Sequence, residues 1–117
     1  MIYLATPYSD VDPEVRKERF QTVNRVAAKL IQGGHHVFSP ISHTHPIALE
    51  GDLPLGWDYW EEYDRKMLSV CSEMFVVRLP GWEESTGVRA EMDIAKEMGI
   101  PVRYLDPHLF LLGRLER

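Results

Sequence analysis

The sequence predicts an α/β fold with a single doubly wound, flavodoxin-like sheet of four to five mostly parallel strands and helices on both faces. Three observations support this fold class. Short apolar runs, typical of buried strands, alternate along the chain with longer segments of helical periodicity. Capping residues, prolines and glycines separate these segments. An alternation of strand and helix places the strands in parallel and joins them by right-handed crossovers.

The first third of the chain gives the clearest element boundaries. Ile2–Ala5 is an apolar run that we expect to form a buried strand. Asp12 is a favourable N-cap and Pro13 suits the first helical position, so a helix is predicted to begin there and to run to about Gln32. Two glycines end this helix, and His36–Ser39 follows as a second strand.

The rest of the chain repeats the alternation after one interruption. Residues 40–56 hold several Pro and Gly residues without clear periodicity, which predicts a long loop. Beyond it we expect a helix at Trp57–Cys71 and a strand at Glu73–Leu79, followed by a glycine-rich turn at Leu79–Gly87. A helix at Thr86–Met98, a strand at Pro101–Leu105 and a short last helix at His108–Leu115 complete the chain.

Length and composition narrow the classes of function. A chain of 117 residues is long enough for one core, and we expect residues 1–117 to form a single domain. The net charge of −5, without a cluster of Lys or Arg, makes a nucleic acid polymer an unexpected partner. No apolar run approaches the ~20 residues that span a bilayer, so no membrane association is expected. Cys71 is the only cysteine, which excludes an internal disulfide and favours a cytoplasmic location.

Glu91 lies where its helix is expected to be apolar. In the predicted helix Thr86–Met98, Val88 lies three residues before it and Ala95 four residues after it, on the same face. A carboxylate that faces a core is unfavourable unless it is paired, hydrogen-bonded or open to a cleft. Glu91 is therefore a candidate functional residue.

Asp64 occupies the same kind of position in the predicted helix Trp57–Cys71, four residues after Trp60 and in the apolar face. One interpretation of the two carboxylates is structural: each pairs with an inward cation, for which Arg16 and Arg19 of the first helix are available, or caps a neighbouring element. The other is functional. Paired carboxylates in a cleft are used in glycosyl chemistry, where one is the nucleophile and the other handles the proton of the leaving group.

Three loops are expected to meet at one edge of the sheet, because ligands of doubly wound folds bind beyond the carboxyl ends of strands, near the switch in strand order. Gly81 and Gly87 allow the close backbone approach of a phosphate-binding turn. Tyr8 directly follows a strand and is placed to stack on a nucleobase. The three loops are residues 6–10, 39–45 and 80–87.

His43 and His45 raise the question of a metal site. An H-x-H pair on an extended loop can face one side, but the spacing specifies no third ligand. We favour a hydrogen bond from His43 to a sugar or phosphate, and expect no metal. The sequence has neither a G-x-G-x-x-G after the first strand nor a Walker A pattern, so no dinucleotide or nucleoside triphosphate cofactor is expected.

Three pieces of the chain together resemble the nucleoside 2-deoxyribosyltransferase-like superfamily, which includes the 2′-deoxynucleoside 5′-phosphate N-hydrolases. They are Tyr3-Leu-Ala-Thr-Pro-Tyr-Ser9, Asp64, and Leu79-Pro-Gly-Trp-Glu-Glu-Ser-Thr-Gly87 followed by Glu91. These pieces stand in the order of the family and at similar spacing. The resemblance implies a flavodoxin-like fold. It also implies a homo-oligomer, a dimer or a tetramer, because members often build their sites across a dimer.

The resemblance further implies a reaction. Glu91 would attack the anomeric carbon C1′ of a deoxynucleoside or its 5′-monophosphate and form a glycosyl-enzyme, which passes to water or to a second base. Asp64 would be the acid that helps the nucleobase to leave. The transferases have an Asp six residues before the nucleophile, whereas Ser85 at this place is more similar to the nucleotide hydrolases, in which it contacts the 5′-phosphate. The expected substrate-binding residues are Tyr8, Ser9, His43, Gly81, Ser85 and Gly87.

Two other functions fit the same pattern. A non-catalytic nucleotide-binding module would keep the fold and the glycine-rich loop, and would bind its ligand without turnover. A metal-dependent hydrolase would use His43 and His45 as ligands, and chelators would abolish its activity.

Overall fold

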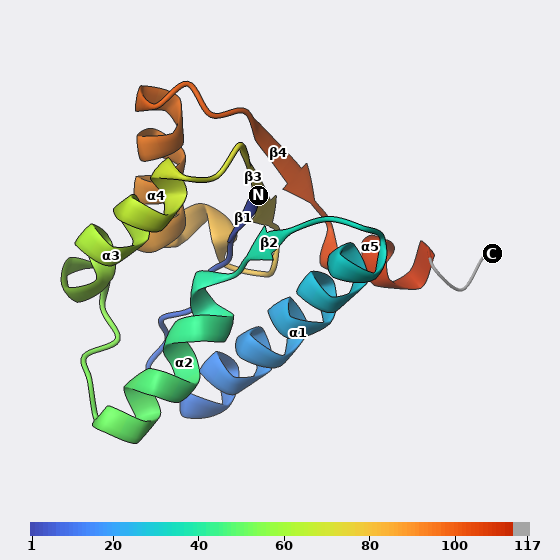
Figure 1. Cartoon of the computed structure of the whole chain (residues 1–117). Coiled ribbons are helices and arrows are strands. Elements are labelled where there is room, and N and C mark those ends of the chain that lie inside the picture. The colour runs from blue at the N-terminus through green and yellow to red at the C-terminus, as the bar shows by residue number, and fades with distance from the viewer. Residues whose placement is uncertain (114–117) are drawn as a thin grey trace.

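The computed structural model of the chain describes residues 1–113. Within this part, strands alternate with helices, as Figure 1 shows. The strands are β1 (Ile2–Ala5), β2 (Val37–Phe38), β3 (Glu73–Val77) and β4 (Val102–Leu105). The helices are α1 (Pro13–Gln32), α2 (Pro40–Gly51), α3 (Trp57–Ser69), α4 (Thr86–Glu97) and α5 (Pro107–Gly113), and a short 3-10 helix, η1 (Trp82–Glu84), precedes α4.

The strands form one parallel sheet in the order β2-β1-β3-β4, which confirms the predicted doubly wound, flavodoxin-like fold. In this sheet, Ile2 of β1 pairs with Val37 on one side and with Glu73 on the other. The direction of winding changes at β1, because β2 lies on one side of it and β3 on the other. This switch point, beyond the carboxyl ends of the strands, is where doubly wound sheets bind ligands.

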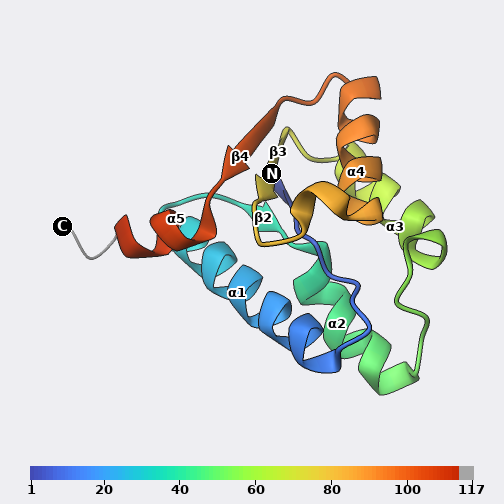
Figure 2. The ribbon, with the colours of Figure 1, turned by 180° about the vertical axis from the view of Figure 1, so that it is seen from behind.

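Alternate side chains of β1 pack into two separate cores. Tyr3 and Ala5 lie in the core formed with α3 and α4, whereas Ile2 and Leu4 lie in the core formed with α1. Figures 1 and 2 show the same layers from opposite sides, with α3 and α4 together on one side of the strands and α1 and α5 on the other. The two-residue period of a strand therefore directs Tyr3 toward the helix that carries Glu91.

The main difference from the prediction is the segment of residues 40–56, which was expected to be a loop. Most of it is the helix α2, Pro40–Gly51. Pro40 takes the first helical position, and the hydroxyl of Ser39 accepts a hydrogen bond from the N–H of Ser42 at 3.2 Å. Both are ordinary start signals of a helix. A second proline inside the same helix masks the periodicity that would have identified it.

The other elements agree with the prediction to within one or two residues at their ends. The helix α3 ends at Ser69 and the strand β3 at Val77, each slightly earlier than predicted. The last helix begins at Pro107, and its predicted end at Leu115 lies outside the described residues. Among residues 1–113, no helix is both long enough and apolar enough to cross a membrane.

Candidate functional site

A cavity of about 420 Å³ lies at the switch point, where the segments that follow β1 and β3 meet. The loop after β1, the helix α2, the helix α3 with the residues before it, and the start of α4 supply its wall. Of the predicted site residues, only His43 and Gly81 are not part of this wall. The described lining residues are Thr6, Tyr8, Ser9, Ile41, Thr44, Leu55, Gly56, Trp57, Asp58, Trp60, Asp64, Glu84, Ser85, Thr86, Gly87 and Glu91.

Glu91 lines the cavity from α4 and is nearly inaccessible, with 5 % of its surface exposed. The hydroxyl of Tyr3 on β1 donates a hydrogen bond to Oε2 of Glu91. Burial raises the pKa of Glu91 well above its usual value, the hydrogen bond from Tyr3 lowers it, and the nearby Asp64 raises it. The carboxyl group predicted to be out of place in an apolar face is thus hydrogen-bonded and open to a cleft.

Asp64 lines the same cavity from α3 and is 8 % exposed. Its Oδ1 is buried and has no hydrogen-bond partner within the described structure. Burial raises the pKa of Asp64 to about 7. Two neighbouring buried carboxyl groups hold one proton between them rather than carry two charges. The hydrogen bond from Tyr3 favours the ionised form of Glu91, and the unpartnered Oδ1 of Asp64 has no such donor.

The structural interpretation of the two carboxylates, as ion pairs with arginines of the first helix, is wrong for the described residues. Arg16 instead donates a hydrogen bond to the backbone carbonyl of Asp10. Arg19 donates from Nη1 to the carbonyl of Ser9 at 3.2 Å and from Nη2 to the carbonyl of Pro80 at 3.1 Å. Arg19 therefore links the loop after β1 to the turn after β3, and neither carboxyl forms an ion pair within residues 1–113.

The start of α4 forms one edge of the cavity. The hydroxyl of Ser85 accepts a hydrogen bond from the N–H of Val88 at 3.2 Å and so caps the helix. Gly87 follows in the first turn and lines the cavity. Gly81 lies in the turn before η1 with a φ of 90°, and a Cβ there would come 3.0 Å from Nη2 of Arg19. Gly81 thus permits the turn and the close contact with Arg19, and it is not one of the residues that line the cavity.

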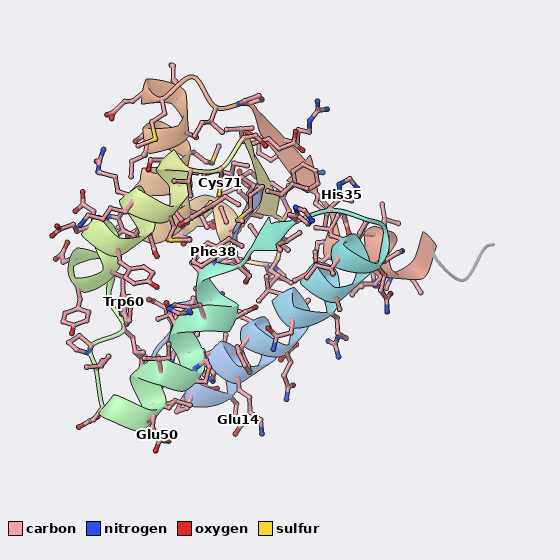
Figure 3. The ribbon with its side chains drawn as sticks, in the orientation of Figure 1. Glu14, His35, Phe38, Glu50, Trp60 and Cys71 are labelled. Carbon is pink, nitrogen blue, oxygen red and sulfur yellow. The ribbon has the colours of Figure 1, made fainter. Side chains whose placement is uncertain are left out.

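Two tryptophans of α3 supply the aromatic part of the wall. The ring of Trp60 lies beside the segment that joins α2 to α3, as Figure 3 shows, and its Nε1 donates to the carbonyl of Pro54 at 2.8 Å. Trp57 lies close to Gly87, because a Cβ on this glycine would come 3.7 Å from the Trp57 ring. Flat apolar rings of this kind suit a nucleobase.

Tyr8 and Ser9 lie in the loop after β1, and both line the cavity as predicted. The hydroxyl of Ser9 donates to the carbonyl of Leu55 at 3.4 Å, which connects this loop to the residues that precede α3. The hydroxyl of Tyr8 lies 2.5 Å from Nδ1 of His45. Tyr8 is thereby held in place from the side of α2.

His43 and His45 both belong to α2 but contact different tyrosines. Nε2 of His43 lies 2.7 Å from the hydroxyl of Tyr63, on which its ring also stacks, whereas His45 contacts Tyr8. Among residues 1–113, no three His, Cys, Asp or Glu side chains gather in a group that could hold a metal ion. The donor set therefore does not fit the metal-dependent hydrolase that the two histidines suggested.

Thr6 and Thr44 also line the cavity, and neither was among the predicted site residues. Thr6 is 5 % exposed, and its Oγ1 has no partner in the part of the chain that the structure describes. Its place directly after β1 was a usable signal, since this is the ligand-binding edge of the sheet. Thr44 falls within the predicted loop of residues 39–45, but its orientation depends on the unexpected helix α2.

Residues 1–106 match the family model described as "Domain of unknown function (DUF1937)". The matched residues include all of the strands β1 to β4 and every lining residue of the cavity. No curated protein matches the chain.

Proposed function

Because the chain belongs to the DUF1937 family, a family of unknown function, we propose a function from its cavity. The protein cleaves the N-glycosidic bond of a deoxynucleoside, with Glu91 as the nucleophile and Asp64 as the acid, and passes the deoxyribosyl group to water or to a second base. One observation carries the proposal. Two buried carboxyl groups line the same cavity. Burial and the nearby Asp64 raise the pKa of Glu91, and burial raises the pKa of Asp64.

The first step forms a glycosyl-enzyme. A carboxylate oxygen of Glu91 forms a bond to C1′ while the C1′–N bond breaks, and the electron pair of that bond leaves with the base. Asp64 gives its proton to the base nitrogen, so the base departs with one less negative charge. This step needs the proton on Asp64 and the negative charge on Glu91, and the hydrogen bond from Tyr3 favours the charge on Glu91.

The second step restores both groups. Water, or the nitrogen of a second base, attacks C1′, and the bond between C1′ and Glu91 breaks with its electron pair returning to the carboxylate. Asp64, now ionised, takes the proton that the incoming group releases. The resemblance to nucleoside 2-deoxyribosyltransferase-like proteins supports this sequence of steps, because the matching segments carry the same two acids.

The charges around the cavity favour a substrate without a phosphate group. None of the described lining residues is Lys, Arg or His. A phosphate dianion would therefore enter an acidic site in which no described lining residue supplies a cation, although the N-terminus of α4 offers partial positive charge. We propose the deoxynucleoside as the substrate, and the 5′-monophosphate that the resemblance of Ser85 implies as a poorer one. The lining residues with carboxyl groups are Asp58, Asp64, Glu84 and Glu91.

The test is an assay of base release from the common 2′-deoxynucleosides and their 5′-monophosphates, with and without an added acceptor base. We expect release from the nucleosides, slower release from the monophosphates, and none from either in Glu91→Gln. Asp93→Asn is the matched control, because Asp93 is an exposed carboxylate on the same helix. Saturable binding without release would leave the non-catalytic binding module. If the protein shows neither binding nor release, the proposal is wrong.

Two expectations from the sequence stay predictions. A homo-oligomer is tested by the mass of the protein in solution, measured by light scattering or sedimentation. A cytoplasmic location is tested by fractionating the cells that make the protein. Neither outcome alters the roles proposed for Glu91 and Asp64.

A further inference from the structure

The cavity carries a second pair of titratable groups, Tyr8 and His45, that the proposed reaction does not use. Tyr8 lines the cavity and is 6 % exposed, while His45 of α2 is 8 % exposed and is not among the lining residues. The Tyr8 hydroxyl and Nδ1 of His45 are 2.5 Å apart. In the described structure His45 therefore reaches a ligand only through Tyr8.

The imidazole of His45 is fixed from two sides. It stacks on Phe20 of α1, with ring centroids 4.3 Å apart and an interplanar angle of 29°. It also meets the Tyr8 ring edge-on, at 5.5 Å and 83°. Tilting the ring out of this plane would lose both contacts, and a half-turn within the plane would place a carbon atom opposite the Tyr8 hydroxyl and lose the hydrogen bond. The geometry thus commits Nδ1 to the Tyr8 hydroxyl.

The donor in this hydrogen bond follows from the chemistry of the two groups. Burial and the nearby Arg16 lower the pKa of His45, so the imidazole is neutral at pH 7. Burial raises the pKa of Tyr8 while Arg16 lowers it, and the phenol keeps its proton at the same pH. A phenol O–H is a stronger donor than a neutral imidazole N–H, and an imidazole nitrogen is a stronger acceptor than a phenol oxygen. Tyr8 is therefore the donor.

We propose that His45 is a positioning residue that accepts the Tyr8 hydroxyl proton in a hydrogen bond and so presents the Tyr8 oxygen to the ligand as an acceptor. With its proton directed to His45, Tyr8 selects a ligand that offers a hydroxyl or an N–H group at this point of the wall. A sugar hydroxyl or an amino group of a nucleobase meets this requirement. The identity of the ligand rests on the proposed function, whereas the direction of the hydrogen bond does not.

The direction of the hydrogen bond is tested in the free protein by nitrogen-15 NMR of the histidine rings. We expect His45 to carry its proton on Nε2 at pH 7, and its Nδ1 signal to move in Tyr8→Phe. The His45 signals are identified by their loss in His45→Asn. A proton found on Nδ1, or a spectrum that Tyr8→Phe leaves unchanged, would overturn the proposal.

The effect on the ligand is tested by kinetics with a deoxynucleoside that the wild-type protein cleaves. His45→Phe keeps the stacked ring without its nitrogens, and we expect KM to rise about tenfold with a smaller change in kcat. His45→Asn places an amide oxygen near the position of Nδ1 and should recover most of the loss. In the Tyr8→Phe background, His45→Phe should have no further effect, because both changes remove one interaction.

The outcomes separate this proposal from the proposed function. If the wild-type protein releases no base, the proposed function fails, and the NMR result alone decides the role of His45. If base is released and His45→Phe leaves KM unchanged in a folded protein, the positioning role is wrong while the proposed function stands. If His45→Phe does not fold, the nitrogen-15 NMR spectra of the wild type and of Tyr8→Phe decide between the same two results.

Discussion

The hydroxyl of Tyr3 donates a hydrogen bond to Glu91, which follows it by 88 positions in the chain. Tyr3 is fully buried in the central strand β1, and burial raises its pKa well above the ordinary value. A phenol with a raised pKa keeps its proton at neutral pH and therefore acts as a donor. The contact therefore stabilises a buried carboxylate where no cation is present among the described neighbours, and it fixes the group that we propose as the nucleophile.

Replacing Tyr3 by Phe removes this donor and keeps the ring. Since the hydrogen bond lowers the pKa of Glu91, the pKa should rise in the variant, and less carboxylate remains at neutral pH. We expect the acid limb of the kcat/KM profile to move to higher pH and base release at neutral pH to fall by about tenfold or more. Tyr104→Phe, on the half-exposed side of β4, is the control. An unchanged profile in Tyr3→Phe would contradict the role of the contact.

Asp64→Asn should change how stability depends on pH. The pKa of Asp64 is raised from 3.8 to about 7 in the folded protein, so the folded state binds more protons than the unfolded state between these values. Its contribution to the free energy of unfolding therefore falls as pH rises through this window and is lowest above it. We expect the stability of Asp64→Asn to decline less across the window, as measured by urea unfolding at a series of pH values. Glu62→Gln, an exposed change on the same helix outside the cavity wall, should keep the wild-type decline.

The proposed acid role of Asp64 has a separate signature in the leaving group. With natural deoxynucleosides, we expect Asp64→Asn to lower kcat by about 10²- to 10⁴-fold, because the base must leave without a proton. With a nitrophenyl 2-deoxyriboside, whose phenolate leaves unprotonated, the loss should be much smaller. Glu91→Gln should lose both reactions, because it lacks the nucleophile. Equal losses for both substrates in Asp64→Asn would show that Asp64 is not the acid.

Much of the fold follows from local signals in the sequence. Asp12 was predicted to cap α1, and its side chain accepts the N–H of Glu14 at 2.9 Å. The helix α2 could not be predicted in this way, because Pro46 inside it removes one backbone hydrogen bond. What stabilises α2 is the burial of Thr44, His45 and Ala48 against neighbouring elements, and this information is absent from a local pattern.

The candidate site was predictable only in part, for a related reason. Glu91 and Asp64 were found because a carboxylate interrupts an apolar helical face, which is a local signal. The hydrogen bond from Tyr3 depends on the register of β1 and the placement of α4, and no spacing indicates it. His43 lies outside the cavity because α2 turns it toward Tyr63, whereas an extended loop was expected there.

Ser85→Ala tests whether the residue at the edge of the cavity has a structural role of its own. The Ser85 hydroxyl accepts the N–H of Val88, and its loss should lower the free energy of unfolding by about 1 kcal/mol, measured by urea unfolding. Ser85→Asp can make the same cap and should restore stability. The aspartate adds a further negative charge beside the carboxyls, so it should discriminate more strongly against a 5′-monophosphate. A stability loss in both variants would contradict the cap as the cause.

Gly87→Ala tests whether Gly87 is required for ligand binding or for the stability of the fold. A Cβ at Gly87 would lie 3.7 Å from the Trp57 ring and 4.0 Å from Oγ of Ser85, which are ordinary contacts. Because Ala is favoured over Gly within a helix by up to about 1 kcal/mol, we expect the free energy of unfolding to stay the same or to rise. The added methyl group occupies space in the cavity wall, so KM for the nucleoside should rise by about tenfold with kcat little changed. Gly99→Ala is the matched contrast, because Gly99 has a φ of 71° after α4 and should lose stability without a change in KM. If Gly87→Ala lost stability and kept its KM, this glycine would serve the helix rather than the ligand.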